Sequence, residues 1–172
     1  MRSRVELMGH SVHQMLIVFP LGLLATSVIF DLLALWLDNT QLSIAGHWAM
    51  AAGILGALLA APFGTLDWLK IPAGTRAKRV GAAHGLGNVV VSALFVASWL
   101  LRDDSGAATN VSLTLALLAV ALALVTAWLG GELVARLGMG VYDDAGLDAP
   151  SSLRSPRERD APPQGGRVTG SR

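Results

Sequence analysis

The chain has 172 residues, of which 53% are hydrophobic and only 15% charged, and its mean hydropathy is +0.55. An ordinary soluble domain carries about 25% charged residues, so this composition indicates an integral membrane protein. The formal net charge of +1 gives no indication of nucleic-acid binding, and the lack of cysteine excludes disulfides, thiolate chemistry and cysteine-ligated metal centres.

Four apolar stretches follow one another, and each is close to the roughly 20 residues with which a helix crosses a bilayer. They cover residues 14–37, 44–69, 83–101 and 111–134. The links between them are short, which makes successive helices antiparallel. The sequence therefore predicts an all-α integral membrane protein, an up-down-up-down bundle of four transmembrane helices. The first stretch is too long for the apolar region of a signal peptide, so we expect it to be retained.

Basic residues near these spans lie mostly on one side. They are Arg2 and Arg4 before the first span, Lys70, Arg76, Lys78 and Arg79 in the second link, and Arg136 after the last span. The third link has only Arg102, beside Asp103 and Asp104. Because basic residues are retained on the cytoplasmic side, this pattern predicts a multi-pass protein of the bacterial cytoplasmic (inner) membrane with both termini inside.

The composition changes after Tyr142, where Pro, Gly, Ser and charged residues replace the apolar ones. Such a segment cannot bury enough apolar surface to fold. We therefore divide the chain into a transmembrane domain, residues 1–142, and a disordered cytoplasmic tail, residues 143–172.

Most polar side chains near the spans fall on the cytoplasmic side. This cluster contains His10, His13, Asp67, His84, Asn88, Trp128 and Glu132. Only Asp31 and His47 lie within spans toward the other side. His13 and Asp31 are eighteen residues apart, five helical turns, so both are expected to face the bundle interior. Ionisable groups at membrane depth are costly, which makes all of them candidates for a functional site.

Three functions remain open for the cytoplasmic cluster. It can be a hydrogen-bonded network that only fixes helix packing, as in a structural or accessory membrane subunit. It can bind haem b for electron transfer, with axial ligation by His10 or His13 together with His84, beside Asn88 and Trp128. A divalent metal is the other cofactor, with His13, His84, Asp67 and Glu132 as ligands. The third function is a proton or ion conduit from Asp31 and His47 to the cluster.

No sequence motif of a soluble enzyme is present, so enzymatic activity stays undecided. The expected partners are the lipid bilayer and, if electrons are transferred, a redox protein or a membrane complex. No motif in the sequence indicates a substrate or an oligomeric state.

Several motifs resemble those of a bacterial membrane-protein family known as domain of unknown function 2231. They are Gly9-His10-Ser11-Val12-His13-Gln14, Val18-Phe19-Pro20-Leu21-Gly22-Leu23, Asp31, His84 with Asn88, and Trp128-Leu129-Gly130-Gly131-Glu132-Leu133. In that family each of the first two histidines is followed by proline, which Ser11 and Gln14 replace here. The resemblance implies four spans and no established activity. Some relatives carry an iron–sulfur domain, which would hint at electron transfer, but this chain has no cysteine to hold one.

Overall fold

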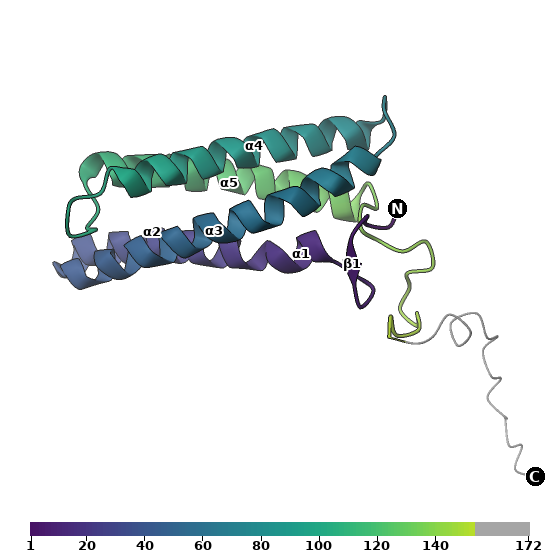
Figure 1. Cartoon of the computed structure of the whole chain (residues 1–172), viewed down its shortest axis with the longest axis horizontal. Helices are drawn as coiled ribbons and strands as arrows, with labels where there is room; N and C mark the ends of the chain where they lie inside the picture. The colour runs from purple at the N-terminus through teal and green to yellow at the C-terminus, as the bar shows by residue number, and fades with distance from the viewer. Residues whose placement is uncertain (154–172) are drawn as a thin grey trace, which may run out of the picture.

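The computed structural model describes residues 1–153, and its four long helices lie side by side (Figure 1). A short antiparallel hairpin precedes them. In chain order the elements are β1 (Glu6–Leu7), β2 (His10–Ser11), α1 (Val12–Leu16), α2 (Val18–Leu37), α3 (Thr40–Lys70), α4 (Arg76–Leu100) and α5 (Asn110–Ala135). The predicted fold class is confirmed. Residues 154–172, most of the predicted tail, lie outside the described part, and residues 143–153 contain turns without helix or strand.

Side-chain caps explain where the helices begin. The hydroxyl of Thr75 accepts from the backbone N–H of Lys78, and α4 therefore starts at Arg76 rather than near residue 83. Thr109 and Ser112 form a reciprocal capping box at the start of α5. Each cap satisfies backbone donors that the first helical turn leaves free. One consequence is that three basic residues of the second predicted link, Arg76, Lys78 and Arg79, belong to the start of α4, whereas Lys70 ends α3.

Proline accounts for the division of the first span into α1 and α2. Pro20 has no backbone N–H to donate to Leu16, the last residue of α1, so one helical hydrogen bond is lost there. Ile17 lies between the two helices in a helical backbone conformation, which keeps α1 and α2 roughly continuous. Together, α1 and α2 form one candidate membrane span, Val12–Leu37.

The bundle consists of two helical hairpins. Helix α2 packs most extensively on α3, and α4 on α5, whereas α3 with α4 and α2 with α5 make smaller contacts. Helices α2 and α4 are therefore diagonal to each other across the bundle axis. The core contains Leu24, Val28, Met50, Val91, Phe95, Ala116 and Ala119. Four helices are long and apolar enough to cross a membrane, and large apolar side chains are exposed along all of them, as a lipid-facing surface requires.

Small residues let α2 and α3 approach closely. A Cβ atom on Gly46 would lie 2.9 Å from the carbonyl oxygen of Ser27, and one on Gly53 would lie 2.7 Å from Leu24. Gly56 contributes as well, because a Cβ atom there would lie 3.1 Å from Pro20. Glycine at these positions of α3 therefore permits the close backbone contact with α2.

The two hairpins repeat one pattern of inward-facing residues. Counting 71 positions along the chain relates His13 to His84, Leu24 to Phe95, Ser27 to Ser98 and Asp31 to Arg102. Counting 66 positions relates Gly46 to Ser112, Met50 to Ala116, Gly53 to Ala119, Ala60 to Thr126 and Gly64 to Gly130. Apart from the two histidines and their two glycines, which are half-buried, both side chains of each pair are buried. The two hairpins therefore carry matching patterns of inward-facing positions, and one matched pair, Asp31 and Arg102, meets in an ion pair.

The two ends of the bundle differ in their loops (Figure 1). We call the end with the β-hairpin, the α3–α4 link and the end of α5 the terminal end. The end with the α2–α3 and α4–α5 links is the opposite end. At the terminal end residues 138–142 are tied to the N-terminal arm, because Tyr142 donates to Glu6 at 3.1 Å and to the Gly9 carbonyl at 2.9 Å. The Arg2 guanidinium bonds to Glu6 and holds the pKa of that carboxyl below its ordinary value.

Candidate functional site

His13 lies at the terminal end, where α1 contacts α3. Its Nδ1 atom is 3.0 Å from the backbone carbonyl oxygen of Ala60. A Cβ atom on Gly64, one turn further along α3, would lie only 2.7 Å from the imidazole ring. Glycine at this position therefore makes the room that the imidazole occupies.

His84 has the same surroundings in the second hairpin. Its Nδ1 atom is 2.9 Å from the carbonyl oxygen of Thr126 on α5. Gly130 follows Thr126 by one turn, and a Cβ atom there would lie 3.1 Å from the ring. Each histidine thus contacts a carbonyl and, four residues later, a glycine of the neighbouring helix.

These contacts determine which ring nitrogen carries the proton. A carbonyl oxygen only accepts hydrogen bonds, so Nδ1 of each histidine must be protonated. In the neutral form, the Nε2 atom of each ring then presents its lone pair. His13 lies on α1, which leads into α2, and His84 lies on α4, so the two histidines come from diagonal helices at the same end of the bundle. The bundle therefore brings two equivalent imidazoles to its terminal end, each able to act as a ligand through Nε2.

Asn88 belongs to the surroundings of His84. Its Nδ2 atom lies 3.2 Å from Nε2 of His84 and donates to the His84 carbonyl at 2.9 Å. The hydroxyl of Thr126 donates to Asn88 Oδ1 at 3.1 Å. Because Nδ1 is the protonated nitrogen, Nε2 of His84 accepts from Asn88. A ligand at this Nε2 would have to displace the Asn88 amide.

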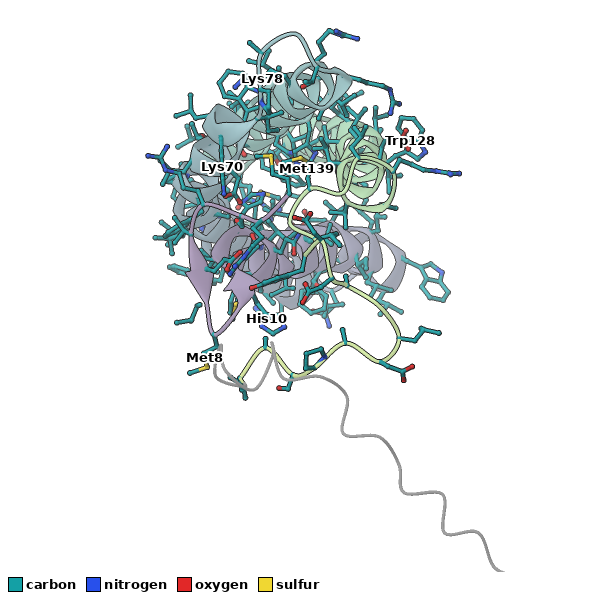
Figure 2. The ribbon with its side chains drawn as sticks, turned by 90° about the vertical axis from the view of Figure 1, so that its right-hand side faces the viewer. Met8, His10, Lys70, Lys78, Trp128 and Met139 are labelled. Carbon is teal, nitrogen blue, oxygen red and sulfur yellow. The ribbon has the colours of Figure 1, made fainter. Side chains whose placement is uncertain are left out.

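The other predicted site residues at this end have separate partners. Asp67 accepts from the Ser3 hydroxyl and the Arg4 backbone N–H of the N-terminal arm. Glu132 pairs with Arg76 at 2.7 Å. His10 is exposed on β2, and Trp128, 66% exposed, is directed away from the bundle (Figure 2). Within residues 1–153, no three histidine or acidic side chains come together as a metal-ligand group.

A buried ion pair dominates the opposite end. The guanidinium of Arg102 donates hydrogen bonds from two nitrogens to the Asp31 carboxylate, and one of these nitrogens lies 3.0 Å from Oδ1. Both side chains are almost completely buried, at 1% and 0% exposure. The same nitrogen that bonds Oδ1 also donates to the carbonyls of Ser43 and Gly106, both at 3.1 Å. Asp31 faces inward as predicted, and its partner connects α2, α3 and the α4–α5 link.

The α4–α5 link is shaped around Asp103. Its carboxylate accepts from the Ser105 hydroxyl at 2.6 Å, from the Ala107 N–H at 2.8 Å and from the Ser105 N–H at 2.9 Å. These bonds, led by that of the Ser105 hydroxyl, hold the pKa of Asp103 below its ordinary value. The turn also carries Gly106, whose φ of 86° is unfavourable for other residues. It directs the Gly106 carbonyl toward Arg102.

His47 is enclosed by two tryptophan rings and by the α4–α5 link. Its ring stacks on Trp99 with centroids 5.1 Å apart and meets the edge of Trp48 at 5.4 Å. A Cβ atom on Gly106 would lie 3.2 Å from its ring, so the link closes over it. His47 therefore belongs to the same group of side chains as the Asp31–Arg102 pair.

Arg102 is the important residue that sequence reasoning missed. It is followed by Asp103 and Asp104, and the sequence pattern uses its charge only to predict the orientation of the chain in the membrane. Two signals in the sequence indicate its role. Asp31 lies within a span and therefore needs a cationic partner. The first and third links, at the opposite end, contain one basic residue, Arg102. Moreover, His84 and Arg102 have the same separation as His13 and Asp31.

These features define a four-helix membrane protein whose two hairpins carry matching patterns of inward-facing positions, with a pair of histidines at one end and a buried ion pair at the other. The chain belongs to the family described as predicted membrane protein (DUF2231), which matches residues 9–143. The resemblance of the sequence motifs is thereby confirmed, and the matched range contains all four long helices. No curated protein and no solved structure matches the chain.

Proposed function

We propose that the chain is a membrane-embedded haem b protein that carries electrons, with His13 and His84 as the two axial ligands. The observation that supports this most is that each ring meets a carbonyl and a glycine of the neighbouring helix in the same way. Each imidazole donates through Nδ1 to that carbonyl, so Nε2 is the nitrogen with the lone pair, which in His84 accepts from Asn88. Histidines that bind a metal usually donate their other ring N–H in this way, which fixes the ring and raises its basicity.

The donor set favours haem over an isolated metal ion. A haem iron is already held by four porphyrin nitrogens, so two imidazoles complete its coordination. An isolated divalent metal takes four or more ligands. The two acids expected to supply them, Asp67 and Glu132, bond instead to the N-terminal arm and to Arg76.

The chain's own residues would set the properties of such a site. The carbonyls of Ala60 and Thr126 hold the ligand rings, and Gly64 and Gly130 leave space for them. Bound haem would supply reversible one-electron transfer. The apolar side chains of the bundle would keep water from the iron, and Asn88 would move from Nε2 of His84 to another partner.

The distribution of charge supports the orientation that the sequence predicts. Lys70, Arg76, Lys78 and Arg79 lie at or beside the α3–α4 link of the terminal end, whereas Arg102 at the opposite end is buried in its ion pair. We propose that the terminal end faces the cytoplasm of a bacterial cell and that both termini lie there. A redox protein or membrane complex on that side would then exchange electrons with the histidine pair, within the surrounding lipid bilayer.

The absorption spectrum of the purified protein tests the proposal. The protein is expressed with a haem precursor, purified in detergent, and compared with His13→Ala, His84→Ala and the control His10→Ala. We expect a Soret band that shifts on reduction, is lost or strongly changed in the first two variants and persists in the control. Absence of the band in the wild type, even after haemin is added, would overturn the proposal.

A second function has its own support. Asn88 already provides a hydrogen bond to Nε2 of His84. In this second function the histidines bind no cofactor and only stabilise helix packing, as in a structural or accessory subunit. In that case His84→Ala lowers stability and no chromophore is found. A proton conduit has less support, because Asp31 is ion-paired and the buried hydroxyls of Ser27 and Ser98 donate to backbone carbonyls.

A further inference from the structure

Nearly every buried polar side-chain atom in residues 1–153 has a hydrogen-bond partner. The exceptions in this described part are three atoms: Nδ1 of His47, Nε1 of Trp99 and Nε of Arg102. All three belong to the opposite end of the bundle. A buried donor without an acceptor costs about 1–3 kcal/mol, so three together in one place call for an explanation.

The three side chains form one continuous group. The rings of His47 and Trp99 stack with centroids 5.1 Å apart. Arg102 follows Trp99 by three residues, and its guanidinium bonds to the carbonyl of Gly106, whose backbone adjoins the His47 ring. Three elements, α3, α4 and the α4–α5 link, therefore each contribute to this group a side chain with an unpartnered polar atom.

The chemistry of these atoms defines what can bind. The indole N–H of Trp99 and the Nε–H of Arg102 can only donate, so the missing group must accept. The terminal nitrogens of Arg102 already neutralise Asp31, which leaves no net charge for an anion to balance. A neutral oxygen acceptor fits both facts.

We propose that the opposite end is a second binding site, occupied by a neutral oxygen acceptor that bonds to Trp99, Arg102 and His47. Its oxygen comes either from ordered water or from the carbonyl group of a lipid-soluble molecule. The two sources require different tautomers of His47. Water can donate to an unprotonated Nδ1, whereas a carbonyl oxygen requires Nδ1 to be protonated. The site stands independently of the histidine pair and of haem.

Nuclear magnetic resonance of the ¹⁵N-labelled full chain in lipid nanodiscs tests the site directly. The Trp99 indole signal is assigned with Trp99→Phe. We expect a hydrogen-bonded indole N–H with a cross-peak either to water or to protons of a non-protein molecule. In the second case, organic extraction and mass spectrometry recover that molecule from the wild type and much less from Trp99→Phe. The ¹⁵N shift of His47 Nδ1 reports the tautomer that accompanies each source. A Trp99 indole with neither cross-peak would overturn the proposal.

Discussion

Replacing Arg102 by methionine should destabilise the protein far more than replacing any surface arginine. The change keeps a long, flexible side chain but removes the bidentate partner of Asp31, which is completely buried. Its carboxylate would also lose the cation that compensates its charge inside the bundle. The pair further connects α2 to Ser43 of α3 and to the carbonyl of Gly106, so three segments lose a shared contact.

The expected magnitude follows from this burial. Breaking a buried ion pair by removing one partner costs about 3–5 kcal/mol, because an unpaired charge stays behind. Arg76→Met is the matched control, since Arg76 also pairs with a carboxylate at 2.7 Å but is 53% exposed. An exposed pair contributes only about 0–1 kcal/mol.

Unfolding in mixed detergent micelles, followed by circular dichroism, measures these free energies. Adding Asp31→Leu to Arg102→Met should restore most of the lost stability, because the uncompensated charge is then gone. The exchange of charges, Asp31→Arg with Arg102→Asp, should be more stable than either single change, since the two positions are equivalent in the two hairpins. The reasoning is refuted if Arg102→Met costs no more than Arg76→Met.

Three further predictions concern the helices and the link. Gly64→Ala should cost about 1–3 kcal/mol, because its Cβ would lie 2.7 Å from the His13 ring, whereas Gly131→Ala has open space and should be neutral or stabilising in the same unfolding assay. Equal effects would count against the packing of His13. Thr109→Ala removes a capping box and should lower the free energy of unfolding by about 1 kcal/mol; no change would show that the cap is dispensable. The pKa of Asp103 is lowered in the folded state, so the contribution of this carboxylate is present above its unfolded pKa and is lost as the pH falls through the folded value. Ser105→Ala should raise that pKa toward the ordinary value in a nuclear magnetic resonance titration, and an unchanged midpoint would contradict the assigned hydrogen bond.

The sequence predicts the spans well because lipid imposes one simple rule on them. A helix that crosses a bilayer must be apolar over about 20 residues, and the four stretches satisfy this without reference to their packing. The boundaries depend on local caps instead. Thr75 extends α4 into a segment rich in Lys and Arg, which a hydropathy pattern assigns to a link.

The candidate site could be predicted only in part. His13 and His84 are recognisable because an imidazole near a span is unusual, but their carbonyl partners, Ala60 and Thr126, give no signal in the sequence. Arg102 was missed because its neighbours in the chain, two aspartates, suggested a solvated link. The repeat that pairs it with Asp31 is hidden, because equivalent positions share burial but mostly differ in residue identity.

The central claim is that His13 and His84 form one ligand pair. Electron paramagnetic resonance of the oxidised, haem-loaded protein tests it most directly, because the spectrum distinguishes iron with two imidazole ligands from iron with one. We predict a low-spin signal of two imidazoles in the wild type, one haem for each chain, and a high-spin signal in either His13→Ala or His84→Ala. A wild-type spectrum without the low-spin signal, or one that either single variant leaves unchanged, would contradict the account.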